Sequence, residues 1–205
     1  MRFLVLIFVL LTFSCKHSDK ESADTALKDG DLIFQTSLSN QSKAIQAATK
    51  SKWSHCGIIY KEGNSYYVFE AIQPVTNTPL KEWIARGEGS HYVVKRLKEA
   101  DKLLTPETLQ KMKAAGKSFA GKDYDLYFGW SDDRIYCSEL IWKIYKRGAG
   151  IEIGILQQLK DFNLTNQRVK QKLKERYGNN VPLYEKVISP AAMFESELLY
   201  TVASK

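Results

Sequence analysis

The sequence predicts an α+β fold in which an antiparallel sheet packs against helices. Two strand-like runs, residues 53–60 and 65–72, are joined by Lys61-Glu62-Gly63-Asn64, a typical hairpin connection. Most strand-like segments precede the main helices along the chain, which favours α+β over alternating βαβ units. A chain of 205 residues, 44% of them hydrophobic, is long enough to bury the core of one domain.

The first 14 residues predict a secretory signal peptide. The segment MRFLVLIFVLLTFS has one arginine followed by an apolar run that is too short to span a bilayer comfortably. Its end, before Cys15, resembles a bacterial lipoprotein signal, in which the cysteine is lipidated and becomes the mature N-terminus. Ordinary signal cleavage near Ser14, without lipidation, is the alternative.

This N-terminus sets the expected domain organisation and localisation. We expect a lipoprotein signal peptide at residues 1–14, a polar tether at 15–27 and a single domain at 28–205. Lipidation of Cys15 would anchor the protein to a membrane of the bacterial cell envelope, on the periplasmic or cell-surface side.

Local patterns predict the remaining elements in chain order. Residues 30–34 follow a turn and predict the first strand, residues 39–50 a short helix, residues 80–86 a helix behind Pro79, and residues 91–97 a further strand. Thr105-Pro106-Glu107 predicts the start of a helix that runs to about Gly121, because threonine caps a helix and proline fits its first turn. A lysine-rich helix near residues 167–177 and a last segment from 187 to 202 complete the chain.

Cys137 stands where an apolar helix is predicted to begin. Leu140, Ile141, Ile144 and Tyr145 recur at helical spacing, and Gly148 is the expected C-terminal stop. Free backbone N–H groups and the helix dipole at such a start stabilise a thiolate, the nucleophilic form of cysteine. An isolated cysteine is more often a small buried apolar residue, so the interpretation depends on its partners.

The hairpin provides two partners, His55 and Glu70. With residues 61–64 as the loop, the two lie directly opposite each other; a turn at Gly63-Asn64 would make the pair diagonal but keep it on one face. Glu70 lies in an apolar strand and needs a partner if it is buried. A carboxylate bound to one imidazole nitrogen frees the other nitrogen as a base. The alternative for His55 is a core histidine bonded to a backbone carbonyl.

Neither the other cysteines and histidines nor the charge pattern predict a second site. Cys56 alternates with His55 on the strand, so we interpret it as a packing residue on the opposite face, and His91 is expected to be exposed. Cysteine and histidine lack metal-ligand spacing, so we predict no metal, no disulfide and no cofactor. The net charge is +7, but the lysines are dispersed and no nucleic-acid motif accompanies them, so no nucleic-acid partner is expected.

A cysteine at a helix start, a histidine on a strand and a carboxylate on the next strand together predict a cysteine hydrolase or acyltransferase. His55 would take the thiol proton of Cys137 and later deliver it to the leaving group. The backbone N–H of Cys137 would help to stabilise the oxyanion of the tetrahedral intermediate.

A set of short segments spans most of the mature chain: Gly30-Asp31-Leu32-Ile33-Phe34, Ser54-His55-Cys56-Gly57-Ile58, Phe69-Glu70-Ala71, Pro79-Leu80, Gly121-Lys122-Asp123-Tyr124-Asp125, Tyr136-Cys137-Ser138-Glu139-Leu140 and Val187-Ile188-Ser189-Pro190. With these segments the sequence resembles the YiiX/YaeF-like permuted papain-like amidases, a circularly permuted branch of the NlpC-type cysteine peptidase superfamily. In unpermuted relatives the cysteine helix precedes the histidine strand, whereas here His55 comes first.

The resemblance implies a circularly permuted papain-like fold with Cys137 as nucleophile, His55 as base and Glu70 as the third polar residue. It also implies that Tyr124, in its Gly-x-x-Tyr context, is an active-site tyrosine whose hydroxyl supports the oxyanion. A half-buried loop aromatic is the alternative for Tyr124.

The expected function is that of a cell-envelope amidase or peptidase that hydrolyses an amide bond in a small peptide, such as a peptidoglycan stem peptide or fragment. A lipid-directed thioesterase or acyltransferase of the lecithin:retinol acyltransferase-like type is one alternative. Those relatives often place a second histidine where Glu70 stands, which favours peptide substrates here. A non-catalytic binding module is the other alternative.

Overall fold

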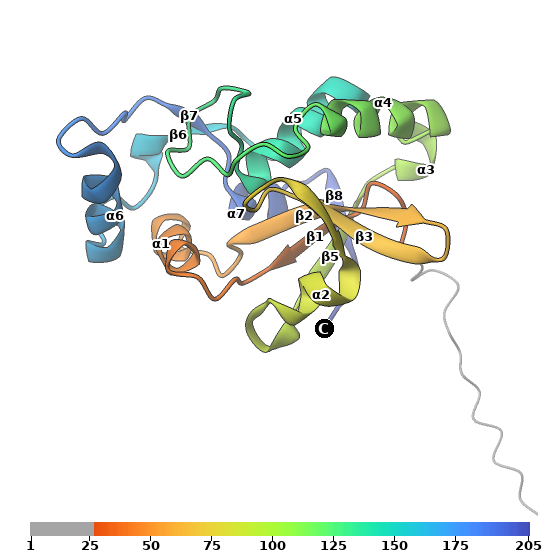
Figure 1. Ribbon diagram of the computed structural model, residues 1–205, viewed down its shortest axis with the longest axis horizontal. Coiled ribbons are helices and arrows are strands. Elements are labelled where there is room, and N and C mark those ends of the chain that lie inside the picture. Colours follow the sequence, from red (N-terminus) through yellow and green to blue (C-terminus); the bar gives the residue numbers. More distant parts are fainter. Residues whose placement is uncertain (1–26) are drawn as a thin grey trace, which may run out of the picture.

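A six-stranded antiparallel sheet lies at the centre of the structure, a computed structural model that describes residues 27–205 (Figure 1). Its strand order is β4-β3-β2-β1-β5-β8. The strands are β1 (Leu32–Gln35), β2 (His55–Glu62), β3 (Ser65–Glu70), β4 (Thr76–Pro79), β5 (Val93–Leu97) and β8 (Leu199–Ser204). A separate short pair joins β6 (Gln157–Gln158) to β7 (Lys186–Val187).

Helices cover both faces of this sheet. They are α1 (Asn40–Thr49), α2 (Leu80–Ala85), α3 (Ala100–Leu103), α4 (Pro106–Lys117), α5 (Cys137–Ala149), α6 (Gln167–Tyr177) and α7 (Pro190–Phe194). In Figure 1, α4 and α5 lie above the sheet and α2 lies below it, while α1 and α6 pack together at one end. The arrangement confirms the predicted α+β class.

Alternation along the strands divides the core into two layers. The larger layer faces α5 and includes Leu32, Phe34, Cys56, Ile58 and Phe69, whereas the smaller layer faces Trp83 of α2 and includes Ile33, Ile59 and Val68. His55 and Glu70 occupy positions that alternate with the larger layer, so they lie on the α2 face.

The two long helices follow their sequence signals at the start more closely than at the end. Thr105 caps α4 by accepting a hydrogen bond from the Thr108 N–H, as predicted, but the helix ends at Lys117 instead of near Gly121. Helix α5 begins at Cys137, as predicted, but continues through Gly148. A Cβ at Gly148 would lie 2.5 Å from the Cα of Met112, so this glycine allows α4 and α5 to pack closely and does not end the helix. Gly150, with φ of 73°, ends it.

The predicted direct pairing of His55 with Glu70 is wrong by two residues of register. Glu62 pairs with Ser65 and Tyr60 with Tyr67, which leaves a two-residue turn at Gly63-Asn64. Gly63 has φ of 60°, which glycine adopts without strain and which suits a tight hairpin turn. His55 and Glu70 are therefore diagonal neighbours on one face, the geometry expected for this shorter turn.

Several sequence predictions lie outside the described residues. They are the signal peptide at residues 1–14, the lipidation site Cys15 and the tether at 15–27 except for its last residue. None of the helices between residues 27 and 205 is long and apolar enough to cross a bilayer.

Candidate active site

Cys137 is the first residue of α5 and is almost completely buried. The preceding residues, Ile135 and Tyr136, are also buried, and Ser138 donates a hydrogen bond to the Ile188 carbonyl at 2.8 Å. These contacts hold the start of the helix against the rest of the core. The thiol therefore sits at the positive end of the helix dipole in a fixed position.

His55 connects Glu70 to Cys137. Nε2 of the imidazole lies 2.5 Å from Oε2 of Glu70, and the ring stacks on Trp83 with 5.8 Å between centroids. The carboxylate occupies Nε2, which leaves Nδ1 for the thiol. A hydrogen bond and a charge interaction with the Cys137 side chain both raise the pKa of His55. The structure thus brings together the three residues that the sequence singled out.

Glu70 is completely buried and accepts hydrogen bonds at both oxygens. Oε2 accepts from His55 and from Trp83 Nε1 at 3.0 Å, while Oε1 accepts from Thr78 Oγ1 at 2.5 Å and from Arg86 Nη2. Four donors compensate the cost of burying the carboxylate. The sequence showed that Glu70 needs partners, but it did not identify Thr78, Trp83 and Arg86.

Electrostatics favour a thiolate–imidazolium pair. Burial alone would lower the pKa of His55, but hydrogen bonds and charge from Cys137 and Glu70 outweigh it and raise that pKa to about 9. The pKa of Cys137 lies well below its ordinary value of 9, because of a hydrogen bond from Cys56 and the interaction with His55, which together outweigh burial. The same imidazole, with Thr78 and Arg86, lowers the pKa of Glu70 in spite of burial. Near neutral pH the proton therefore resides on His55, and the imidazolium N–H donates to the Cys137 thiolate.

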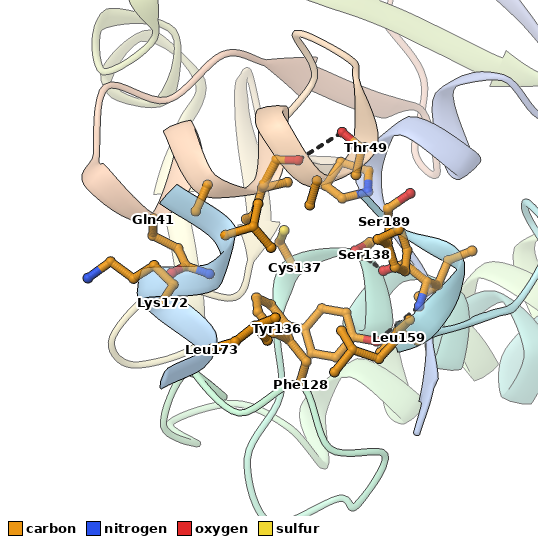
Figure 2. Close-up of a pocket in the computed structure, with 18 of the residues that line it drawn as sticks. Gln41, Thr49, Phe128, Tyr136, Cys137, Ser138, Leu159, Lys172, Leu173 and Ser189 are labelled. Carbon is orange, nitrogen blue, oxygen red and sulfur yellow. Dashed lines mark hydrogen bonds between the residues drawn. The ribbon is translucent and has the colours of Figure 1, made fainter. Parts of the chain in front are cut away.

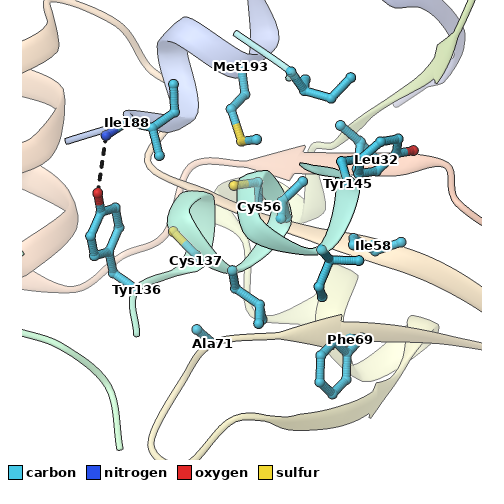
Figure 3. Close-up of a cluster of buried hydrophobic side chains, with 14 of the residues drawn as sticks. Leu32, Cys56, Ile58, Phe69, Ala71, Tyr136, Cys137, Tyr145, Ile188 and Met193 are labelled. Atoms are coloured by element: carbon cyan, nitrogen blue, oxygen red, sulfur yellow. Dashed lines mark hydrogen bonds between the residues drawn. The ribbon is translucent and has the colours of Figure 1, made fainter. Parts of the chain in front are cut away.

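Cys56 does more than pack. It points to the α5 face, as the alternation predicted, and lies beside Cys137 in the same buried cluster (Figure 3). Burial and the neighbouring Cys137 raise the pKa of Cys56, so its thiol stays protonated and donates to the Cys137 thiolate. The position of α5 over the sheet decides which residue contacts Cys56, and the sequence alone does not specify that position.

We expect Cys56→Ala to make Cys137 less reactive at mildly acidic pH. Loss of a hydrogen bond to a charged group should lower the alkylation rate of Cys137 near pH 6 about tenfold. The measurement is the iodoacetamide rate constant as a function of pH, followed by mass spectrometry of the peptide containing Cys137. Cys56→Ser is the matched control, because its hydroxyl can still donate. Equal profiles for wild type and Cys56→Ala would contradict a role for the thiol–thiol contact.

Tyr124 lies close to Cys137. Its backbone bridges to Ile135, two residues before the cysteine, and its N–H donates to Gln73 Oε1 at 2.7 Å. Burial, followed by the negative charge of Cys137, raises the pKa of its hydroxyl, so that group remains protonated. A protonated phenol near the thiolate has the chemistry required of an oxyanion donor.

Lys143 fixes the loop that leads into α5. Its buried Nζ donates to the carbonyls of Trp130 and Ser131, both at 3.0 Å, and to Asp132 Oδ1 at 2.9 Å. It also lies 2.7 Å from Glu139 Oε1, one helical turn back on α5. Arg147 binds the same Asp132 carboxylate with two hydrogen bonds, at 2.8 and 2.9 Å. The helix that carries the cysteine therefore also holds the segment before it.

A hollow opens beside the thiol, between α1, α6 and the segment that precedes α7. Figure 2 shows the Cys137 sulfur among the side chains that line it. Its cavity volume is only about 90 Å³. The hollow is therefore a narrow slot. Its walls come from segments far apart in the sequence, and the sequence did not predict it.

The family model of the permuted papain-like amidase enzymes, YaeF/YiiX, C92 family, matches residues 26–203. This chain belongs to the C92 family. C92 members are permuted papain-like cysteine amidases, so the chain is an enzyme of that class, and the permuted papain-like fold inferred from the sequence is confirmed.

Two relatives resemble this C92 chain over most of their length. The uncharacterized protein YiiX of Escherichia coli (strain K12) is 50% identical over 176 residues, which are 86% of each chain. A crystal structure of metalloprotein YiiX from Escherichia coli O157:H7 is also 50% identical, with a TM-score of 0.82, and the match covers 87% of this chain and 97% of that one. Within residues 27–205 of this chain, no group of three or more His, Cys, Asp or Glu side chains is placed to hold a metal ion.

Proposed function

We propose that this C92 chain is a cell-envelope cysteine amidase in which Cys137 is the nucleophile, His55 the general acid–base and Glu70 the residue that orients His55. One observation carries the proposal: the buried Glu70 carboxylate binds Nε2 of His55, and the same imidazole interacts by hydrogen bonding and charge with the thiol of Cys137, the first residue of α5. This is the nucleophile, base and orienting residue in the order that covalent catalysis needs.

The reaction starts with attack of the Cys137 thiolate on the carbonyl carbon of the scissile amide. The Cys137 N–H and the Tyr124 hydroxyl stabilise the oxyanion. When the C–N bond breaks, His55 transfers its proton to the leaving nitrogen, and the acyl group stays on sulfur as a thioester. His55 then removes a proton from water, the resulting hydroxide attacks the thioester, and the products are a carboxylic acid and free Cys137.

The proposed setting is the bacterial cell envelope, with a small peptide such as a peptidoglycan stem peptide or fragment as substrate. The apolar leader at residues 1–14 and the lipoprotein-like sequence before Cys15 support secretion and membrane anchoring. A catalytic domain on a lipid tether would meet peptide fragments released near the membrane.

The proposal is tested by incubating the mature protein with defined peptidoglycan fragments and N-acyl amino acids in ¹⁸O-labelled water. We expect hydrolysis of an amide bond, with one ¹⁸O atom in the new carboxylic acid, detected by liquid chromatography and mass spectrometry. Stoichiometric alkylation of Cys137 should stop the reaction. Absence of amide hydrolysis across this panel, or hydrolysis that survives alkylation, would refute a cysteine amidase.

A further inference from the structure

We propose that Cys56 and Cys137 form a redox-active site, in which a hydroperoxide oxidises Cys137 and Cys56 then closes a reversible disulfide with it. The disulfide switches the nucleophile off and protects its sulfur from further oxidation. This chemistry needs only the Cys137 thiolate and a neighbouring thiol, and it is independent of the amide substrate.

The two thiols meet between the sheet and α5. Cys56 on β2 pairs with Phe34 of β1, and its side chain belongs to the core layer that faces α5. Cys137 begins α5, whose first turn is held by the hydrogen bond from Ser138 to the Ile188 carbonyl. A side-chain hydrogen bond joins the two thiols, which are both free and buried (Figure 3). The sheet and the helix thus hold two sulfur atoms next to each other, as a disulfide requires.

The slot gives an oxidant access to only one of these sulfurs. Cys137 lines the slot, whose cavity volume of about 90 Å³ has room for a molecule as small as hydrogen peroxide, whereas Cys56 is not among the lining residues. The hydrogen bond from Cys56, together with His55, lowers the pKa of Cys137, and the thiolate is the form that peroxides oxidise. Burial and the neighbouring Cys137 raise the pKa of Cys56, so its thiol does not compete. Cys137 is therefore oxidised first, and Cys56 reacts second.

Two steps convert the pair of thiols to a disulfide. The Cys137 thiolate attacks one oxygen of hydrogen peroxide; an S–O bond forms, the O–O bond breaks, and the leaving hydroxide takes the proton of the His55 imidazolium. The Cys56 sulfur then attacks the sulfur of the resulting sulfenic acid. An S–S bond forms, the S–O bond breaks, and the hydroxyl group leaves with the Cys56 proton as water. The two sulfurs lose two electrons in total, which reduce hydrogen peroxide to two molecules of water.

Cys56 decides whether the oxidation can be reversed. A sulfenic acid without a neighbouring thiol reacts with more peroxide to sulfinic and sulfonic acids, which thiols do not reduce. A thiol already in contact with Cys137 forms the disulfide before that happens. The disulfide removes the thiolate that would attack a substrate, and a dithiol reductant restores both thiols by exchange. The oxidised chain is thus an inactive but recoverable form.

The test treats the mature protein with hydrogen peroxide and then with dithiothreitol, and it follows peptide masses and the alkylation of Cys137 by iodoacetamide. In wild type we expect a peptide pair joined through Cys56 and Cys137, lighter by two hydrogen atoms, and recovery of about nine-tenths of the alkylatable Cys137 after reduction. Cys56→Ser keeps a hydroxyl donor but cannot form the disulfide. In this variant we expect sulfinic or sulfonic acid at Cys137 and recovery of at most about one-tenth.

Met193→Leu is the matched control. Met193 lies in the same buried cluster and has a thioether that peroxide can oxidise, while leucine fills a similar volume. Recovery of Cys137 in this variant should equal that of wild type, because both thiols remain.

Equal recovery in wild type and Cys56→Ser, or a disulfide that joins Cys137 to Cys15 instead of Cys56, would overturn the redox site and leave the amidase untouched. If Cys56→Ser does not fold, the disulfide peptide of wild type decides alone. Because these measurements count thiols, a recoverable disulfide in a protein that hydrolyses no amide would refute the amidase and leave the redox site standing.

Discussion

Replacing Cys137 by alanine is expected to lower kcat/KM for any amide substrate by at least about 10³-fold, because the thiolate forms the covalent intermediate and no neighbouring group can replace it. Cys56 is a neighbouring thiol, but burial, the largest cause of its raised pKa, still keeps it protonated when the Cys137 thiolate is absent. Initial rates with the same N-acyl amino acid measure the effect. Cys137→Ser is the companion variant, because its hydroxyl is similar in size but does not ionise in this pH range, and it should be about as inactive.

The same substitution should leave the fold intact. Alanine removes one sulfur atom from a buried position, and a change of that size costs about 1 kcal/mol or less in free energy of unfolding. It also removes a charge from the core, which acts in the opposite direction. Thermal unfolding of both variants checks this point. Residual activity above one-tenth of wild type in a folded Cys137→Ala protein would exclude Cys137 as the nucleophile.

Removing the Glu70 carboxylate should reduce both stability and activity. Glu70→Ala leaves Trp83 Nε1, Thr78 Oγ1 and His55 Nε2 without their buried acceptor, which should lower the free energy of unfolding by about 3 kcal/mol. Without an orienting carboxylate, His55 can rotate or change tautomer, and we expect kcat/KM to fall about 10²-fold or more. Denaturant unfolding and initial rates measure the two effects.

Glu70→Gln separates the charge from the hydrogen bonds. Its amide oxygen can still accept from His55 and Trp83, so the loss of stability should be smaller than for alanine. Loss of the negative charge should lower the pKa of His55 from about 9, so the alkaline limb of the kcat/KM profile should move to lower pH. An unchanged alkaline limb in a folded Glu70→Gln protein would show that Glu70 does not act through His55.

The Glu70 contribution to stability should also depend on pH. The pKa of this carboxyl in the folded protein lies below its ordinary value of 4.5, so the folded state binds its proton less readily than the unfolded state. Its contribution is therefore present above about pH 4.5 and is lost as the pH falls below that value. In Glu70→Gln this part of the acid sensitivity should be absent.

The sequence was most informative where local chemistry decides the structure. The Thr105 cap, the start of α5 at Cys137 and the face shared by His55 and Glu70 depend on neighbouring residues or on strand alternation, and each agrees with the structure. The exact register did not follow, because turns of two and four residues were both compatible with the loop sequence. Gly148 was taken as a helix end because its close contact with Met112 is a property of packing between two helices.

Long-range packing determines the features that the sequence did not predict. The contact between Cys56 and Cys137 depends on where α5 lies over the sheet, and the donors that complete the Glu70 site come from β4, α2 and its C-terminal cap. The slot is formed where α1 meets α6, more than 100 residues further along the chain. No local pattern in either helix specifies that meeting.

The Lys143 contacts have a consequence for substrate capture. Because one buried ammonium group binds two carbonyls and a carboxylate of residues 130–132, that loop loses its conformational freedom when the protein folds and not when substrate arrives. Lys143→Met would fill similar space without these bonds and would leave the segment that leads into Cys137 loose. Weaker binding would then appear as a higher KM, although residue 143 itself touches no substrate.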